Sequence, residues 1–225
     1  IIETNRNTLI NGCKNTVIPN SVTGIDPLAF RGCIGLTSIE IPRSVTHIGD
    51  DAFIGCSGLT SITVESGNTK YDSRNNCNAI IETNTNTLIA GCKNTVIPNS
   101  VTTLSRTVFY GCSSLTSIKI PKSVMTIPSS AFWDCPGLTS IIVESGNTVY
   151  DSRNNCDAII ETNSNTLING CKNTVIPNSV TSIGDGAFYG CSSLTSIEIP
   201  NNVTDIGWYA FEGCDGLTSV TIGTS

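Results

Sequence analysis

The stretch GCSSLTSIKIP at residues 111–121 decides the fold, because closely matching stretches recur along this 225-residue chain. It returns as GCIGLTSIEIP at 32–42 and as GCSSLTSIEIP at 190–200. Looser copies begin at three further residues: Gly55, Asp134 and Gly213. Self-similarity at a fixed period is typical of repeat architectures, in which each unit buries its apolar side only against its neighbours. The sequence therefore predicts an elongated stack of coils.

A longer unit contains these coils, because the segment 64–102 returns at 143–181 with only four positions changed. The changed pairs are Lys70/Val149, Asn78/Asp157, Thr85/Ser164 and Ala90/Asn169. We expect one solenoid over 1–225, divided into a tail at 1–22, units at 23–101 and 102–180, and a partial unit at 181–225. Because the chain begins inside a unit, we expect it to be a fragment of a longer protein.

Each unit holds two 23-residue coils and one 33-residue coil. In the coil at 36–58, Ile39 and Ile41 alternate with polar residues, as in a strand with one buried face. Pro42 ends this strand because proline lacks a ladder donor, and Phe53 completes the apolar wall. Equivalent residues of stacked coils should lie about 4.8 Å apart, so about nine coils would give a body on the order of 40 Å long.

The 33-residue coil carries the segment NCNAIIETNTNTLIAGC, which has apolar pairs on both sides of an Asn-rich centre. A β-hairpin with its turn near Asn84 fits this pattern, since Asn tolerates the positive φ of such turns. Ile80 would then face Ile89, and Ile81 would face Leu88. The alternative is an elongated coil whose extra residues bulge outward.

The full coil pattern I-P-x-S-V-T-x-I-G-x-x-A-F-x-G-C-x-x-L resembles the BspA-type (Treponema-like) leucine-rich repeat. That repeat occurs in surface proteins of Bacteroidetes and other gut and oral bacteria, and in some anaerobic protists. The resemblance covers essentially the whole chain, and the 33-residue coil is the main departure from it. It implies a right-handed superhelix, mainly β, with a parallel concave sheet and short helical turns or loops on the convex side. It also implies secretion or cell-surface display.

Charge and motifs exclude several classes of function. The net charge of −6 and pI of about 4.7 argue against a nucleic-acid partner, which needs a basic patch. No apolar run reaches the roughly 18 residues of a membrane span, so we expect no membrane insertion. The single histidine, His47, lies at a variable surface position, and no nucleotide-binding or nucleophile motif is present. We therefore expect a non-enzyme without cofactor or metal.

Eleven cysteines are present, and six of them occupy one position of the coil. These six are Cys33, Cys56, Cys112, Cys135, Cys191 and Cys214. We expect them to be buried, reduced thiols that act as small apolar residues. Disulfides are the alternative, and the best candidates are Cys77–Cys92 and Cys156–Cys171, which would face each other across the hairpin. The oxygen-rich loops around Asp72 and Asp151 match no calcium loop, so polar turns are expected there.

Two surfaces provide candidate binding residues. The residue after the repeated Phe is aromatic in three coils, and two further aromatic residues lie near it in coil phase: Tyr110, Trp133, Tyr189, Trp208 and Tyr209. They form a binding stripe, because Tyr and Trp give interfaces a large contact area, or they cover the Phe ladder. The polar face of the predicted sheet carries Thr116, Ser117 and Lys119, which bind a broad partner or keep the sheet soluble.

The resemblance and the repetition together predict a binding module of a secreted or surface-anchored bacterial repeat protein. Its expected partners are host extracellular-matrix proteins, other surface proteins, glycans or other cells, since repeated weak sites add avidity. The alternative is a stalk or spacer whose parent protein carries its activity elsewhere. Because the ends of the stack lack polar capping coils, self-association through them is also expected.

Overall fold

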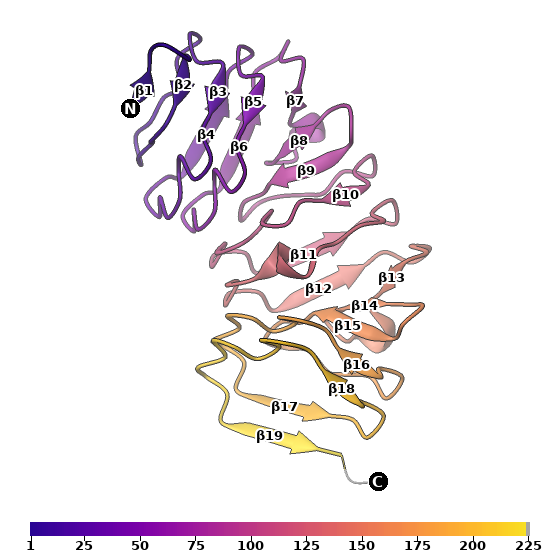
Figure 1. Ribbon diagram of the computed structural model, residues 1–225. Coiled ribbons are helices and arrows are strands. Elements are labelled where there is room, and N and C mark those ends of the chain that lie inside the picture. The colour runs from indigo at the N-terminus through magenta and orange to yellow at the C-terminus, as the bar shows by residue number, and fades with distance from the viewer. Residues whose placement is uncertain (224–225) are drawn as a thin grey trace.

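The computed structural model describes residues 1–223 as a bent stack of β coils that runs from the N-terminal to the C-terminal end (Figure 1). Strands β4 and β17, one near each end, point in clearly different directions, so the stack turns along its length. Short strands and turns form almost all of the described chain, and the helical elements are three 3-10 turns. These are η1 (Arg74–Asn76), η2 (Ser129–Phe132) and η3 (Arg153–Asn155). The predicted solenoid is confirmed.

The L-T-S-I segments form the longest strands, which we call the long-strand face. These strands are β4 (Ser38–Ile41), β6 (Ser61–Val64), β11 (Ser117–Ile120), β12 (Ser140–Val143), β17 (Ser196–Ile199) and β19 (Ser219–Ile222). Each pairs in parallel with the equivalent strand of the adjacent coil, so that Ile39 lies opposite Ile62. The parallel pairing is as predicted, but it comes as three separate pairs: β4 with β6, β11 with β12, and β17 with β19.

A threonine interrupts the long-strand face in each hairpin-bearing coil. Thr95 takes the place that Ile39 has in its own coil, and it is buried at 7% exposure. Its hydroxyl donates to the Asn78 carbonyl at 2.7 Å and accepts from the Cys92 amide at 2.8 Å. Because a buried hydroxyl must find partners, the segment turns toward its own coil and forms no strand.

Three mixed sheets line the second face. The first holds β1 (Ile2–Glu3), β2 (Thr8–Leu9), β3 (Gly24–Ile25) and β5 (His47–Ile48). The second holds β7 (Tyr71–Asp72), β8 (Ile80–Glu82), β9 (Thr87–Ala90) and β10 (Thr103–Leu104). The third holds β13 (Tyr150–Asp151), β14 (Ile159–Glu161), β15 (Thr166–Asn169), β16 (Ser182–Ile183) and β18 (Asp205–Ile206).

The predicted hairpin is confirmed as β8–β9, which we call the first hairpin, and again as β14–β15, the second. At the N-terminal end, β1 and β2 are also an antiparallel pair. Ile81 faces Leu88 as expected, but Ile80 faces Ala90 and not Ile89. The reason is a register shift between Ile80 and Ile81, which lets both isoleucines be buried. The hairpin is therefore part of the coil wall.

The A-F-x-G-C corners of the coils form a ladder that we call the rim. Only six corners reach it, at Phe30, Phe53, Phe109, Phe132, Phe188 and Phe211. Backbone hydrogen bonds join successive corners, as from Gly55 N to Tyr110 O at 3.0 Å and from Gly111 N to Trp133 O at 2.9 Å. The hairpin coils do not reach the rim, so the corner at Phe53 stacks directly on the corner at Phe109.

The phenylalanine rings stack only within pairs of adjacent 23-residue coils. Ring centroids lie 5.1 Å apart for Phe30–Phe53, 5.3 Å for Phe109–Phe132 and 5.1 Å for Phe188–Phe211. Between pairs, the glycine of the hairpin coil passes beneath the next ring. A Cβ on Gly91 would lie 2.2 Å from a carbon of Phe109, so only glycine fits there.

Candidate functional site

The rim carries three of the positions that vary between the coils. Three positions of the corner change from coil to coil, while the alanine or valine and the phenylalanine between them hardly change. Three residues before the phenylalanine stand Pro27, Asp50, Arg106, Ser129, Asp185 and Trp208. Two before it stand Leu28, Asp51, Thr107, Ser130, Gly186 and Tyr209, and directly after it stand Arg31, Ile54, Tyr110, Trp133, Tyr189 and Glu212.

Tyr110, Trp133 and Tyr189 lie in one row along the rim, each half-buried. The ring centroids of Tyr110 and Trp133 are 6.4 Å apart and tilted by 59°. Trp133 and Tyr189 stack at 4.6 Å. Burial raises the pKa of Tyr110, and hydrogen bonding to Asp134 raises it further. These contacts bring the three predicted aromatic residues together, with part of each ring already in contact with its neighbour.

Trp133 also packs inward. A Cβ on Gly186 would lie 2.4 Å from the indole, so the absence of a side chain there makes room for the ring. Its Nε1 is buried and has no hydrogen-bond partner within residues 1–223, and the same is true of Asn169 Oδ1. Both residues line one small cavity of about 10 Å³. Trp133 therefore fills the junction between the second hairpin and the rim.

Trp208 and Tyr209 are the most exposed aromatic residues of the rim, at 77% and 61%. Their ring centroids lie 6.4 Å apart, and the Trp208 amide donates to Asp185 Oδ1 at 2.7 Å. Tyr209 has a φ of 57°, a conformation that bulky residues rarely adopt. The hydrogen bond to Asp185 helps to hold the backbone in this conformation. Both rings are mostly exposed to solvent.

Thr116, Ser117 and Lys119 are exposed beside or on β11, as predicted for the polar face. Lys119 Nζ contacts Glu144 Oε1 at 2.6 Å, and this hydrogen bond lowers the pKa of Glu144. The carbonyl of Thr116 accepts from the Thr139 hydroxyl at 3.0 Å. Some polar groups of this face therefore bond to the adjacent coil and hold the stack together.

All eleven cysteines are free thiols. The alternative of Cys77–Cys92 and Cys156–Cys171 disulfides is wrong, because each thiol donates to a nearby carbonyl of the hairpin coil. Cys92 Sγ, for example, lies 3.2 Å from Asn78 O. Of the six cysteines at one coil position, five are buried as expected and Cys33 is half-exposed. Burial raises the pKa of these thiols, to about 12 at Cys56, so they serve as core residues.

The oxygen-rich loops are polar turns closed by their own side chains. Arg74 Nε donates to Asp72 Oδ1 at 2.7 Å, and Arg74 Nη1 donates to Asn86 Oδ1 at 2.9 Å. Arg153, Asp151 and Asn165 repeat this arrangement in the next unit. Residues 1–223 contain no group of three or more His, Cys, Asp or Glu side chains placed to hold a metal ion.

His47 is exposed on β5, as predicted for a variable surface position. No helix in the described part of the chain is long and apolar enough to cross a membrane.

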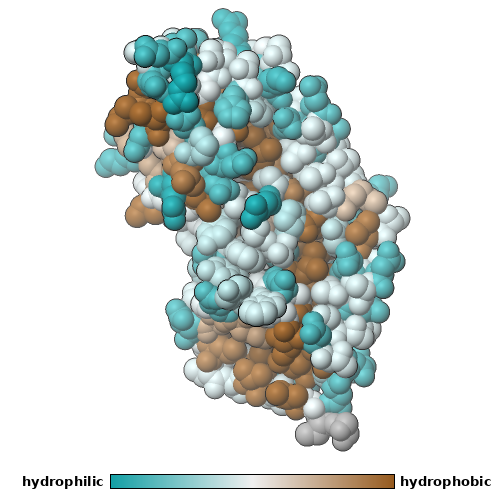
Figure 2. Space-filling view, viewed as in Figure 1, coloured by the Kyte–Doolittle hydropathy of each residue, from teal (hydrophilic) through white to brown (hydrophobic). Residues whose placement is uncertain are grey.

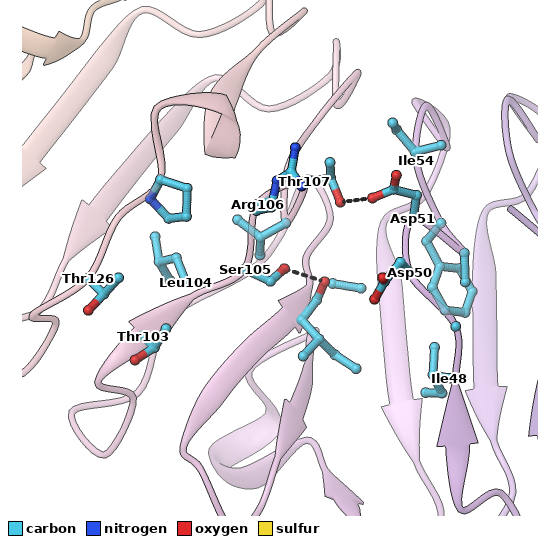
Figure 3. A pocket seen from close by; sticks show the side chains of 17 residues that line it. Ile48, Asp50, Asp51, Ile54, Thr103, Leu104, Ser105, Arg106, Thr107 and Thr126 are labelled. Atoms are coloured by element: carbon cyan, nitrogen blue, oxygen red, sulfur yellow. Dashed lines mark hydrogen bonds between the residues drawn. The ribbon is translucent and has the colours of Figure 1, made fainter. Parts of the chain in front are cut away.

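A pocket of about 460 Å³ opens at the junction between the first hairpin and the rim, and sequence reasoning missed it (Figure 3). One wall carries Asp50 and Asp51, and the opposite wall carries Ser105, Arg106 and Thr107. Thr107 donates across the gap to Asp51 Oδ1 at 2.6 Å, and Ser105 donates to the Ile89 carbonyl at 3.0 Å. The sequence does hold one sign of it: residues 64–102 and 143–181 differ at only four positions, and one of these, Ala90/Asn169, lies at the pocket.

Comparison with known proteins shows the family to which the repeat belongs. The family model described as "BspA type Leucine rich repeat region" matches residues 8–90, 80–169 and 159–225, in six copies. The chain belongs to the BspA-type leucine-rich-repeat family. The predicted resemblance is confirmed, and a search of the curated proteins found no match.

Several solved bacterial structures resemble this BspA-type chain. A leucine-rich cell surface protein from Faecalibacterium prausnitzii is 32% identical at a TM-score of 0.60, covering 92% of this chain and 53% of that one. A leucine-rich repeat protein from Eubacterium ventriosum is 22% identical at 0.53, covering 90% and 60%. The pneumococcal vaccine antigen PcpA is 20% identical at 0.52, covering 91% and 49%. The chain thus spans less than two thirds of each, and the last two show the fold alone.

Proposed function

We propose that this chain is a non-enzymatic binding module of a secreted or cell-surface bacterial protein. Its partners would be host extracellular-matrix proteins, other surface proteins, glycans or other cells. The observation that carries the proposal is the rim, where three variable positions of each corner lie together while the alanine or valine and phenylalanine between them repeat. Exposed aromatic rings are typical of interaction surfaces, and the similar protein from Faecalibacterium prausnitzii is a cell surface protein.

The rim supports binding through the exposed pair Trp208–Tyr209 and the row formed by Tyr110, Trp133 and Tyr189. The long-strand face offers a second surface at Thr116, Ser117 and Lys119. Because the coils repeat the same scaffold, a partner with repeated epitopes would gain avidity from several weak contacts.

A binding screen against immobilised fibronectin, laminin and collagen, together with a glycan array, tests the proposal. We expect at least one ligand to bind, and to lose binding in a Trp208→Ala/Tyr209→Ala variant. Met125→Ala is the control, since Met125 is an exposed apolar residue, at 46%, that lies on neither of these two surfaces. Failure of the unmodified chain to bind anything in either screen would contradict the proposal.

A spacer is the second candidate function, and the near-identity of residues 64–102 and 143–181 favours it. Duplication of a unit lengthens a stalk without requiring new contacts. The measurement that separates the two functions is the same screen, because a spacer would show no ligand and no effect of the aromatic substitutions.

Self-association is a further proposal for the partners of this chain. Exposed apolar side chains gather at both ends of the stack (Figure 2), among them Ile1 at 77% at the N-terminal end and Ile222 at 69% in the last coil. Burying them against a second copy would be favourable at roughly 25 cal/mol per Å² of apolar surface. Analytical ultracentrifugation should then show a sedimentation coefficient that rises with concentration, and a constant value would contradict it.

A further inference from the structure

The pocket at the first hairpin junction has the size and composition of a small-ligand site. Small-molecule sites enclose about 300–1,000 Å³ and combine apolar walls with a few placed polar groups. This pocket has about 460 Å³. Ile48, Ile89, Leu104 and Pro128 supply the apolar lining, and the polar groups stand on two facing walls (Figure 3).

The polar groups of this pocket match hydroxyl groups better than they match an ion. Asp50 is exposed and offers two acceptor oxygens, while Arg106 is exposed on the facing wall and offers only donors. The hydroxyls of Thr103 and Thr126 can each donate and accept, and the Ser105 hydroxyl, which donates to Ile89 O, can still accept. Since the charges on the two walls are opposite, a neutral ligand with many hydroxyls satisfies both.

The backbone at the pocket is already hydrogen-bonded, which argues against a peptide added as a strand. The Leu104 amide donates to Thr126 O at 2.9 Å, and Thr103 also pairs with Thr87 on the other side. The Ile48 amide donates to the Tyr71 hydroxyl at 3.0 Å. Strand addition requires a free strand edge, so recognition at this site depends on side chains.

The equivalent junction in the next unit differs at most of the residues that line this pocket, and three of the differences change the space between the walls. There Trp133 stands in place of Ile54, Gly186 in place of Thr107, and Asn169 in place of Ala90. The Asn169 amide bridges the gap by donating to Ser129 O at 2.7 Å.

Ala90 has no side chain that could make this bridge in the first unit. The indole of Trp133 occupies the remaining space of the second junction. The same frame therefore exists in an open and a closed form within one molecule.

We infer that the pocket between Asp50 and Arg106 is a saccharide-binding site of the first hairpin junction. The hydroxyl groups of one sugar ring would bond the two polar walls, and its C–H face would contact the apolar lining. This inference rests on the proposed binding function and names one site and one ligand class for it.

The test is an NMR titration of the isotope-labelled 225-residue chain with glucose, galactose, mannose, N-acetylglucosamine and fucose. Concentrations up to about 20 mM detect a dissociation constant in the millimolar range. We expect at least one sugar to shift the amides of Ile48, Ala90, Leu104 and Val108. No shift with any sugar, or shifts confined to other regions, would overturn the inference.

Two matched variants place the site. The filled variant, Ile54→Trp/Ala90→Asn/Thr107→Gly, gives the first junction the residues of the second and should lose the shifts. The opened variant, Trp133→Ile/Asn169→Ala/Gly186→Thr, widens the second junction but leaves Ser129 and Asp185 where the first has Asp50 and Arg106. It should therefore add no sugar shifts at Ile127 and Ile183. Unchanged sugar binding by the filled variant would overturn the inference.

Asp50→Asn provides a milder test that does not depend on either triple variant folding. It keeps the size of the exposed side chain but replaces two acceptors with one, so we expect sugar affinity to fall about tenfold, which corresponds to about 1.4 kcal/mol. An affinity equal to that of the unmodified chain would count against the site.

A parallel adhesion assay on matrix-protein surfaces separates this inference from the proposed function. If the unmodified chain adheres but binds no sugar, the inference fails and the proposed function stands. If it binds sugar but neither matrix proteins nor any glycan on the array, the inference stands and the adhesive role fails.

Discussion

The two hairpin junctions that lie between corners of the rim share one frame and differ in what fills it. At both junctions a glycine passes beneath a phenylalanine ring, Gly91 under Phe109 and Gly170 under Phe188, and an added Cβ would lie 2.2 Å from the ring in each case. The hairpins β8–β9 and β14–β15 have the same register, including the same irregularity. The frame is therefore set by the positions that repeat.

The filling is set by positions at which the two junctions differ. The first junction is an open pocket of about 460 Å³, whereas Trp133, Asn169 and Gly186 at the second border a cavity of about 10 Å³. Trp133 and Asn169 account for this difference by occupying the gap. A repeat protein can thus acquire a distinct local site without changing its scaffold.

The largest expected effect tests the shared frame. Phe109→Ala and Phe188→Ala should each lower the free energy of unfolding by about 3–5 kcal/mol, since both rings are 1% exposed. Because the two rings cover equivalent glycines, the two losses should agree within about 1 kcal/mol. Urea denaturation measures both. A large loss at one ring with little at the other would break the comparison.

The next effect tests the fit between Trp133 and Gly186. Gly186→Thr should cost about 2–3 kcal/mol, because it places a Cβ against the indole and because φ is +59° there. Adding Trp133→Ile should recover part of this loss, since the smaller side chain frees the space. A double-mutant cycle measures the coupling. Strict additivity of the two losses would contradict the fit.

A smaller effect concerns the bridge across the second junction. Asn169→Ala removes the hydrogen bond to Ser129 O (2.7 Å) and should cost about 1 kcal/mol. The mirror substitution Ala90→Asn places its side chain in the open pocket and should change stability by less than about 0.5 kcal/mol. Thermal unfolding compares the pair. Equal losses from both substitutions would show that the two junctions are not packed differently.

The smallest effect is a dependence on acid. Burial raises the pKa of Asp72, but the hydrogen bonds from Arg74 and Thr83 outweigh it and hold this pKa below its ordinary value. A lowered folded-state pKa stabilises the protein fully above the ordinary value of about 3.9 and loses that contribution as pH falls below it. The pair is partly exposed, so the loss should stay below about 1 kcal/mol.

Unfolding measured between pH 6 and pH 3 in the unmodified chain and in Asp72→Asn tests this effect. The variant should lose less stability on acidification than the unmodified chain. An identical decrease in both proteins would show that Asp72 makes no contribution in this range.

Features governed by local periodicity could be predicted from the sequence. The alternation at Ile39 and Ile41 predicts the parallel strands, and the symmetry around Asn84 predicts the hairpin. The facing of Ile80 and Ile89 was wrong, because a register shift that buries both Ile80 and Ile81 leaves no trace in the pattern.

Features governed by competing contacts could not be predicted. The threonine at position 95 fits a strand pattern, yet its buried hydroxyl takes partners within its own coil and interrupts the sheet. Cys77 and Cys92 are symmetric in sequence, but their thiols have nearby carbonyls as partners. The exposure of Tyr110, Trp133 and Tyr189 depends on stacking between coils, and their role in binding stays a prediction.

A crystal structure of the filled variant, Ile54→Trp/Ala90→Asn/Thr107→Gly, is the measurement that most directly tests whether three side chains decide the state of a junction. We predict that the new indole lies in the former pocket and stacks on Tyr110, as Trp133 stacks on Tyr189 at 4.6 Å. An indole that points into solvent above an unchanged open pocket would contradict this account.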